Sequence, residues 1–397
     1  MSFEVPEHVR PIRARVREFV EQRVYPAEPL LDDRRGAEGG AVLRGLMNEA
    51  KAAGLWALGH PKEIGGGGLP FLDYVYVNEV IGRSEYAMIA LGTHSLQDSI
   101  MLNLHAAPTW RDRYLKPLVA GEVFPSFAMT EPEVASSDPT QLQTRAVLDG
   151  DHWVINGRKW FTTGADVAAY TTVMARTEPD APPHQAFSMI IVPTDTPGYT
   201  IVRDVPVMGM HGGHCEVLYE DVRVPRDNLL GPRGAGFLIA QQRLGPGRIF
   251  HCMRWLGQAQ RAFDLMCERA NSRVAFGSPL ADKQQVQQMI FETAAEIQAC
   301  RLLTLDAAHK IDQGDPARIE IGIIKVVGAQ MLHHAIDRAI QVFGAKGVSA
   351  DTPLERMYRH ARFARIYDGP DEVHRVSVAR QILRTYKKGE VWDFGVR

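Results

Sequence analysis

The 397-residue sequence predicts a mostly α-helical protein with a β domain in its middle. Apolar residues recur at helical spacing before residue 124 and again after residue 232. The segment between them consists of short β-type runs separated by turn residues. We therefore expect an N-terminal α-helical domain (1–124), a middle β-barrel domain (125–232) and a C-terminal four-helix bundle (233–397).

The first domain is predicted to be helices with one interruption. Val9, Val16 and Val20 fall on one face of a first helix. The stretch HPKEIGGGGLP (60–70) is expected to form a loop, because four glycines with flanking prolines do not continue a helix. Further helices are expected at 71–83, 86–104 and 108–120.

The middle segment favours a small antiparallel barrel or sandwich. The runs YTTVMART, FSMIIVP and YTIVRDV are rich in Val, Ile, Thr and Tyr, and turn signals such as LDGD and TDTPG separate them. Strands that follow one another without intervening helices argue against a Rossmann unit.

The C-terminal segment predicts four helices with short connections, which is typical of a bundle. Ile319, Ile323 and Val327 keep one helical face apolar in the third of them. The expected helices cover residues 235–271, 280–312, 316–344 and 371–387.

Composition excludes several classes of protein. The chain has 45 basic and 47 acidic side chains, and no basic stripe predicts a nucleic-acid partner. The N-terminus lacks an apolar leader and no apolar run approaches membrane-spanning length, so we expect a cytoplasmic protein without membrane insertion. Reduced thiols are expected, because no CxxC spacing occurs among Cys215, Cys252, Cys267 and Cys300.

Two motifs in the β region combine hydroxyl groups with aromatic rings. FAMTEPEVASSD (127–138) offers hydroxyl donors in a turn-rich stretch, and INGRKWFTTGA (155–165) places two aromatics beside two threonines. This pattern suits a flat heteroaromatic such as a flavin. An ordinary strand-to-turn passage and a pair of core aromatics are the competing interpretations.

Three further motifs lie among the C-terminal helices. RVAFGSPLADKQ (273–284) brings an arginine close to a helix start, which suits a pyrophosphate as well as it suits a plain helix corner. QVFGAKGVSA (341–350) ends a helix with two glycines. IYDGPDEVHR (366–375) holds three carboxylates and a histidine, and the acids at 371 and 372 also fit the first turn of a helix.

In this order and spacing, the segments TEPEVASS, INGRKWFTT, RVAFG…DKQ, QVFGAKG and IYDG resemble the acyl-CoA dehydrogenase family of flavoproteins across essentially the whole chain. RLGPGRIFHCMR (243–254) is most similar to the subfamily of family members ten and eleven. The resemblance implies the same three-domain fold, with FAD as the cofactor and an acyl-CoA as the substrate.

The resemblance also implies roles for particular residues. Thr130 and Thr163 are expected near the N5 and O4 edge of the flavin, and Phe161 is expected beside its ring. Arg273 and its neighbours are expected to bind the FAD of the partner subunit. Ser136, Arg248 and Gly369 are expected to contact the substrate. The residues implied to bind FAD are Phe127, Met129, Thr130, Ser136, Phe161, Thr162, Thr163, Arg273, Phe276, Gln284, Gln341, Val342, Gly344, Ala345, Pro370 and Glu372.

Asp368 matches the general base of the family. It is implied to remove the α-hydrogen of an acyl thioester as a proton, while the β-hydrogen leaves as hydride to flavin N5. Two departures from the family matter. Aspartate replaces the commoner glutamate, which shortens the reach of the base. Gly247 stands where some relatives carry their base, and glycine does not ionise.

The resemblance therefore implies an acyl-CoA dehydrogenase of fatty acid β-oxidation that passes electrons to an electron-transfer flavoprotein and forms a homo-oligomer, tetramer or dimer. An oxidase of the same fold, acting on acyl-CoA or a nitroalkane with oxygen, is the alternative. A metal-dependent hydrolase built on HGGHCE (211–216) is a third hypothesis, but we expect no metal, because this spacing does not define a closed ligand set.

Overall fold

The computed structural model describes residues 4–394, and the chain forms two compact units. The bundle unit comprises Met1–Asp32, Pro70–Ala90 and Gly245–Arg397, and the sheet unit comprises Asp33–Leu69 and Leu91–Leu244. Neither unit is continuous in sequence. The domain boundaries at 124/125 and 232/233 stay a prediction.

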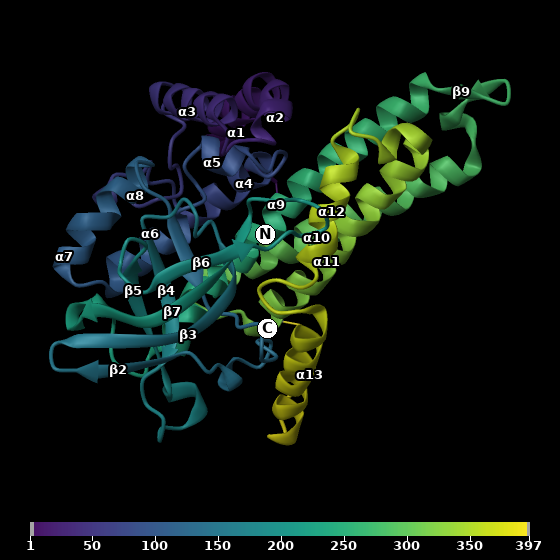
Figure 1. Ribbon diagram of the computed structural model, residues 1–397. Coiled ribbons are helices and arrows are strands. Elements are labelled where there is room, and N and C mark those ends of the chain that lie inside the picture. The colour runs from purple at the N-terminus through teal and green to yellow at the C-terminus, as the bar shows by residue number, and fades with distance from the viewer. Residues whose placement is uncertain (1–3, 395–397) are drawn as a thin grey trace. The chain divides into compact units, whose positions relative to one another are not determined.

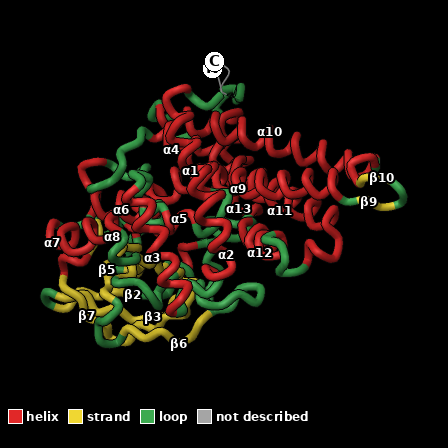
Figure 2. The backbone as a smooth tube through the Cα atoms, turned by 90° about the horizontal axis from the view of Figure 1, so that it is seen from above, coloured by secondary structure: helices red, strands yellow, loops and turns green. Residues whose placement is uncertain are grey.

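The bundle unit is built around α11 (Arg318–Phe343), on which α10, α12 and α13 all pack. Figures 1 and 2 show α10 and α11 running alongside each other. Gly328 brings α11 close to its neighbours, because a Cβ there would lie 3.1 Å from the Trp255 ring. The other helices of this unit are α1 (Arg10–Phe19), α2 (Tyr25–Leu31), α4 (Phe71–Ile81), α5 (Ala87–Ala90), α9 (Gly236–Ser272, which begins in the sheet unit), α10 (Gln284–Asp312), α12 (Leu354–Ala364) and α13 (Asp371–Lys387).

The helix α11 corrects one expectation. The segment Arg318–Val348 is long and apolar enough, by length and composition, to cross a membrane, although no apolar run of that kind was expected. Within this segment 61% of the apolar window is buried inside the protein. Its hydropathy follows from its place at the centre of the bundle, where helices cover it on several sides.

Two helical predictions differ from the structure. The expected helix 86–104 is broken between α5 and α6 (Leu96–His105), and Gly92 in the break adopts φ +67°. A Cβ at Gly92 would lie 2.5 Å from the Trp56 ring, so the turn makes room for that side chain. The helix α12 was not predicted, although Leu354, Met357 and Ala361 are buried at helical spacing.

The sheet unit contains an eight-stranded mixed sheet with the order β6-β7-β3-β2-β4-β5-β8, and β1 pairs with β4. The pairings of β4 with β1 and with β2 are parallel, whereas an antiparallel arrangement was expected. The strands are β1 (Pro125–Ala128), β2 (Arg145–Asp149), β3 (His152–Thr163), β4 (Tyr170–Arg176), β5 (Phe187–Pro193), β6 (Tyr199–Asp204), β7 (His214–Pro225) and β8 (Leu229–Leu230).

Two apolar cores stabilise the sheet unit. Trp153, Ile155 and Val217 belong to a core made by the strands alone. A second core joins strand residues such as Met189 to helical residues such as Leu118. The helices of this unit are α3 (Ala37–Ala52), α6, α7 (Pro108–Trp110) and α8 (Lys116–Ala120).

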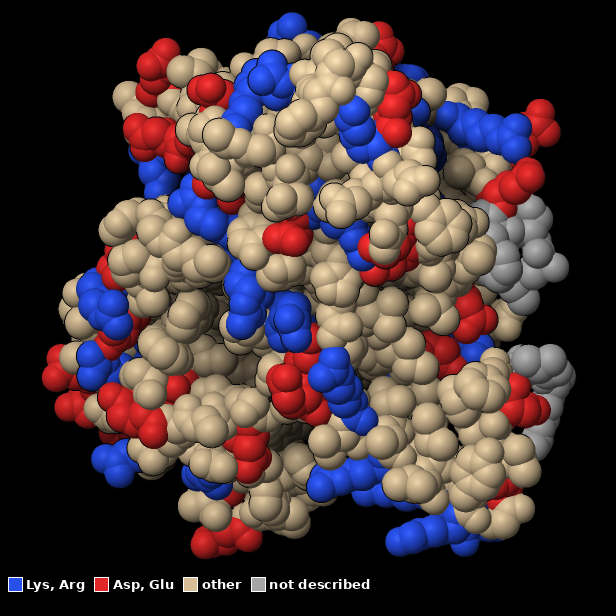
Figure 3. Space-filling view, turned by 90° about the vertical axis from the view of Figure 1, so that its right-hand side faces the viewer, with Lys and Arg blue, Asp and Glu red and all other residues tan. Residues whose placement is uncertain are grey.

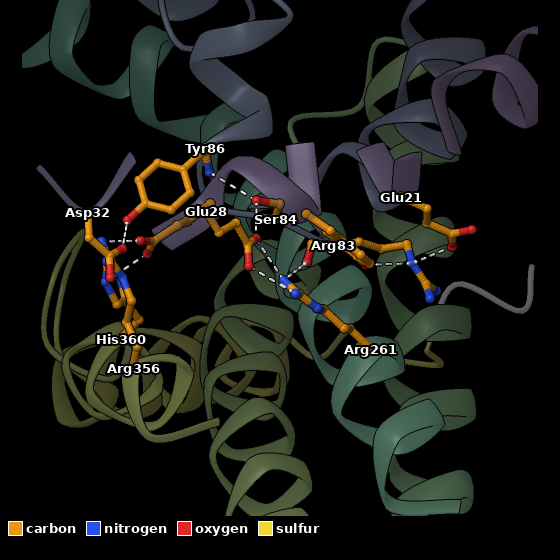
Figure 4. Close-up of polar contacts among 11 residues, drawn as sticks. Glu21, Glu28, Asp32, Arg83, Ser84, Tyr86, Arg261, Arg356 and His360 are labelled. Carbon is orange, nitrogen blue, oxygen red and sulfur yellow. Dashed lines mark hydrogen bonds and ion pairs between the residues drawn. The ribbon is translucent and has the colours of Figure 1, made fainter. Parts of the chain in front are cut away.

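A network of ion pairs joins the short N-terminal helices of the bundle unit to its long helices (Figure 4). Arg261 on α9 donates to both oxygens of Glu28 at 2.8 and 2.9 Å, and Ser84 donates to the same carboxylate at 2.6 Å. Arg356 and His360 on α12 contact Glu85 at 2.5 and 2.7 Å. The network fixes α2 and the end of α4 against α9 and α12.

The surface carries charges of both signs. On the face seen in Figure 3, Lys and Arg alternate with Asp and Glu over the described residues, and no extended basic stripe crosses that face. This pattern agrees with the near balance of 45 basic and 47 acidic side chains.

Candidate active site

Asp368 lies in the tight turn between α12 and α13. It adopts φ +54°, and Gly369 follows with φ +95°. Aspartate tolerates the left-handed region better than most residues, and glycine occupies it without a steric cost. A Cβ at Gly369 would lie 2.7 Å from the Nε2 atom of His374. Pro370 then occupies the N-cap of α13, so the sequence DGP reverses the chain and starts the last helix.

Donors from two helices hold the main-chain carbonyl of Asp368. Arg248 on α9 donates to it through Nε and Nη2 at 3.2 and 3.1 Å, and His374 Nε2 lies 3.0 Å from the same oxygen. The structure thus brings Asp368, Gly369 and Arg248 together, and the roles that the resemblance implies for them stay a prediction. The guanidinium group of Arg248 contacts the main chain of the expected base, and this fixes the turn.

The carboxylate of Asp368 contacts a residue that the sequence did not single out. His251 Nε2 lies 3.0 Å from Asp368 Oδ2, and each side chain is 22% exposed. His251 is one helical turn after Arg248 on α9, so both side chains lie on the same face of that helix. That spacing is the signal that could have identified His251.

Buried polar groups surround this pair within the bundle unit. Tyr367 accepts a hydrogen bond from Trp255 Nε1 at 2.9 Å. Lys325 on α11 is fully buried and donates to the carbonyl of Ala364 at 2.8 Å. Burial lowers the pKa of Lys325, and the carboxylate of Asp368 acts against that shift.

In the sheet unit, Phe161 is the exposed aromatic residue of the INGRKWFTTGA motif. It is 39% exposed and adopts φ +50° at an irregularity in the pairing of β3 with β7. Thr163 is exposed beside it, and its hydroxyl lies 2.9 Å from His214 Nδ1. Thr162 is fully buried, so its side chain does not share the exposed face of Phe161.

The loop 127–138 is tied to strand β3 by internal bonds. Thr130 donates to the carbonyl of Trp160 at 2.7 Å, and the Ser136 hydroxyl accepts from the backbone N–H of Glu131 at 2.9 Å. Lys159 donates to the carbonyl of Met129 and to the carboxylate of Glu131, both at 2.8 Å. The implied cofactor residues Thr130 and Ser136 therefore also maintain the shape of this loop.

Phe127, in β1 just before the loop, lies under the guanidinium of Arg243 at 4.5 Å from the ring centroid. Phe127 and Met129 are both partly exposed and pack against the second core of the sheet unit.

The residues expected at the nucleotide end of FAD lie elsewhere in the bundle unit. Figures 1 and 2 show the hairpin of β9 (Val274–Ala275) and β10 (Ser278–Pro279) at one end of the long helices, and Phe276 at its turn is fully exposed. Val342 is 7% exposed, so its side chain faces the bundle core. The other implied nucleotide-end residues are exposed: Arg273, Gln284, Gln341, Gly344 and Ala345.

The FAD-contact roles of Pro370 and Glu372 stay a prediction. Pro370 is partly exposed, and Glu372 is exposed in the first turn of α13.

The residues present fit FAD. An exposed aromatic ring beside a hydroxyl suits the flat flavin, and an exposed arginine ahead of the N-terminus of α10 suits a pyrophosphate. A metal ion would need a group of His, Cys, Asp or Glu side chains instead. Over residues 4–394, no group of three or more His, Cys, Asp or Glu side chains is arranged to hold a metal ion.

Three family models match the chain in sequence order. They are the N-terminal, middle and C-terminal domains of acyl-CoA dehydrogenase, at residues 6–122, 126–222 and 234–383. The fold and the family models thus define a flavin-dependent oxidoreductase. The chain belongs to the acyl-CoA dehydrogenase family and is an FAD-dependent oxidoreductase that acts on acyl-CoA.

Individual relatives agree with the family assignment. The chain is 46% identical over 402 residues to the probable acyl-CoA dehydrogenase FadE2 of Mycobacterium tuberculosis, covering 98% of both chains. It is 41% identical over 398 residues to acyl-CoA dehydrogenase family member 10 of Mus musculus, and 39% identical over 395 residues to family member 11 of Homo sapiens. These matches cover 96% and 94% of this chain, and the predicted likeness to members ten and eleven is confirmed.

The chain spans only 37% of the length of mouse family member 10 and 50% of human family member 11. Among solved structures, a putative acyl-CoA dehydrogenase from Mycobacterium abscessus superposes with a TM-score of 0.90 at 37% identity, over 96% of this chain and all of that one.

Proposed function

We propose that the protein desaturates an acyl-CoA thioester between its α and β carbons, with Asp368 as the general base. The observation that carries the proposal is the fixed turn at Asp368, in which Arg248 and His374 hold the main chain and His251 contacts the carboxylate. A base that stays in one place is worth about 10²–10⁴-fold in rate.

The reaction divides between the cofactor and the chain. When bound, FAD supplies the hydride acceptor for the β-hydrogen. The chain's own task is to take the α-proton onto a carboxylate oxygen of Asp368 and to keep that carboxylate aimed at the α-carbon. The partly buried position of Asp368 keeps most bulk water away from the transfer.

For the electron acceptor we propose an electron-transfer flavoprotein. The alternative is an oxidase of the same fold that uses oxygen, and the aspartate at position 368 keeps this alternative open, because relatives that oxidise nitroalkanes share an aspartate base. We further propose a role in fatty acid β-oxidation, a homotetramer or homodimer, and a cytoplasmic location.

The test of the base is Asp368→Asn, with Asp149→Asn as the control because Asp149 is an exposed carboxylate on the sheet unit. We expect Asp368→Asn to retain FAD and to lose at least about 10²-fold in the rate of flavin bleaching by acyl-CoA under anaerobic conditions. Bleaching of Asp368→Asn at the wild-type rate would show that another group is the base.

The substrate and the acceptor are tested with the wild-type protein. A panel of acyl-CoA thioesters is added anaerobically, the flavin absorbance is followed, and air is then admitted. We expect at least one thioester to bleach the flavin and the colour to return slowly in air. Rapid reoxidation would favour the oxidase, and flavin that stays oxidised with every thioester would contradict the proposed substrate class.

A further inference from the structure

We propose that His251 is a positioning residue for Asp368, whose carboxylate it holds through its Nε2–H. This inference rests on the proposed function, because it assigns to His251 a role in the proton transfer that Asp368 performs. It adds a residue on α9 that none of the sequence motifs had marked for the reaction.

The tautomer of His251 follows from its two partners. Arg254 Nη2 lies 2.9 Å from His251 Nδ1, and a guanidinium group only donates hydrogen bonds. The Nδ1 atom therefore accepts, and the proton of the neutral imidazole is on Nε2. The Nε2 atom lies 3.0 Å from Asp368 Oδ2, so His251 is placed within reach to donate that proton's hydrogen bond to the carboxylate.

His251 stays neutral for two physical reasons. A second proton on Nδ1 would break the hydrogen bond from Arg254 and place two positive charges side by side. Burial also lowers the pKa of His251, and the charge of Arg254 acts in the same direction, against the carboxylate of Asp368. In the proton transfer, the α C–H bond breaks and the proton ends on Asp368, while His251 keeps its own.

A hydrogen bond to an ionised carboxylate favours the ionised form. His251 therefore favours the ionised form of Asp368, which is the form that accepts a proton. It also restrains the rotation of the Asp368 side chain, which is shorter than the glutamate of most relatives. Arg248, one turn earlier on α9, holds the main-chain carbonyl of the same residue. One face of α9 thus contacts both the main-chain carbonyl and the side-chain carboxylate of Asp368.

Other ionisable groups lie near this pair, and Tyr74 on α4 acts on Arg254 as well. They are Arg248, Cys252 and Arg254 on α9, Lys325 on α11, Tyr367 in the turn, and Asp371 and His374 on α13. The test therefore measures pH dependence in variants that alter His251 alone.

The experiment compares His251→Phe with His251→Gln. Phenylalanine keeps the ring that packs against Trp255 and Tyr367 but removes the N–H donor, whereas glutamine keeps a side-chain N–H donor. His334→Ala is the control, because His334 is an exposed histidine that pairs with Glu296 on the surface. FAD content and melting temperature are measured for each protein.

Two readouts are used. The first is the rate of anaerobic flavin bleaching as a function of pH. The second is the loss of deuterium from the α-carbon of 3,3-dimethylbutanoyl-CoA, which has no β-hydrogen to transfer and so reports on the base alone.

In both readouts we expect His251→Phe to be about 10- to 100-fold slower than wild type near pH 7, with the rising limb of its pH profile moved to higher pH. His251→Gln should recover most of the rate, and His334→Ala should match wild type. Wild-type rates and an unchanged pH profile in His251→Phe would overturn the proposal, as would equal losses in His251→Phe and His251→Gln.

The Asp368→Asn variant separates this inference from the proposed function. If Asp368→Asn loses deuterium exchange and His251→Phe does not, the base is correct and only the role of His251 fails. If Asp368→Asn exchanges deuterium at the wild-type rate, the proposed function itself fails.

Discussion

Lys159 and Glu131 form an ion pair that is closed off from water inside the sheet unit. Lys159 is fully buried, and Glu131 also accepts hydrogen bonds from the backbone N–H groups of Gln143 and Thr144 at 2.6 and 2.9 Å. Burial lowers the pKa of Lys159 to about 8. Burial alone would raise the pKa of Glu131, but Lys159 and the N–H donors bring it below the usual value.

This pair predicts a defined dependence of stability on pH. At pH 7, Glu131→Gln should lower the free energy of unfolding by about 3–5 kcal/mol, because it leaves Lys159 buried without a counter-charge. The pKa of Glu131 is lower in the folded protein than in the unfolded chain. The stabilisation that ionised Glu131 gives the folded protein is therefore complete above the ordinary glutamate pKa of about 4.3, and it is lost as the pH falls through the pKa of the folded protein.

Urea unfolding of wild type and Glu131→Gln from pH 7 down to pH 3 measures this contribution. The difference between the two proteins should shrink below pH 4, and a constant difference over the whole range would contradict the assignment. Asp149→Asn, which removes an exposed carboxylate of the same unit, should change stability by less than about 1 kcal/mol.

The sequence pointed to Asp368 but not to its partner His251. The IYDG motif and the family resemblance pointed to Asp368, Gly369 and Arg248, and the structure brings these three together. His251 is separated from Asp368 by more than a hundred residues, so only the packing of α9 against the turn reveals their contact. Thr162 and Val342 are buried because neighbours in the fold, not their motifs, decide which way a side chain faces.

At the level of elements, periodic apolar patterns predicted the long helices well. The expected helix 371–387 coincides with α13, and 235–271 lies within one residue of α9 at each end. The helix α12 was missed because charged residues such as Arg356 and Arg359 lie between its apolar positions and lower its mean hydropathy. Arg356 pairs with Glu85 from a distant segment, a contact that the sequence does not display, whereas Arg359 pairs with Glu355 one turn earlier on the same helix.

Glu28 and Arg261 form a largely buried ion pair within the network in Figure 4. Its side chains are only 16% and 11% exposed, and Arg261 also lies 3.7 Å from the centroid of the Tyr25 ring. We predict that Glu28→Gln lowers the free energy of unfolding by about 3 kcal/mol, because the largely buried guanidinium of Arg261 loses its counter-charge.

Urea unfolding followed by far-ultraviolet circular dichroism checks this value. The matched control is Arg223→Gln, which breaks the exposed pair of Arg223 with Asp149 and should cost no more than about 1 kcal/mol. Equal effects of the two substitutions would mean that the network in Figure 4 contributes no more than surface charges do.

For the whole molecule, α13 carries an exposed stripe of apolar side chains that Arg380 and Lys387 interrupt. Val373, Val376, Leu383 and Tyr386 are each at least 40% exposed and follow one another at helical spacing. Exposed apolar stripes of this kind mark protein–protein contacts, and this supports the proposed homo-oligomer.

We predict that Leu383→Glu lowers the molar mass of the particle in solution, because a carboxylate in an apolar contact must be desolvated. Light scattering after size exclusion measures the mass of wild type and variant at the same concentration. Gln313→Glu, which adds the same charge at an exposed position after α10, should leave the mass unchanged. An unchanged mass for Leu383→Glu would exclude this stripe from the oligomer contact.

The discontinuity of the bundle unit has a consequence for synthesis on the ribosome. Residues up to Asp32 and the segment Pro70–Ala90 pack in the same unit as the helices that follow Gly245. At about 5–20 residues per second, some 10–40 s pass between the emergence of these two parts of the chain. During that interval Glu28 lacks its partner Arg261 and the Tyr86 ring lacks Arg356, so a nascent chain stalled before residue 245 should expose surfaces that the finished unit covers and should recruit chaperones.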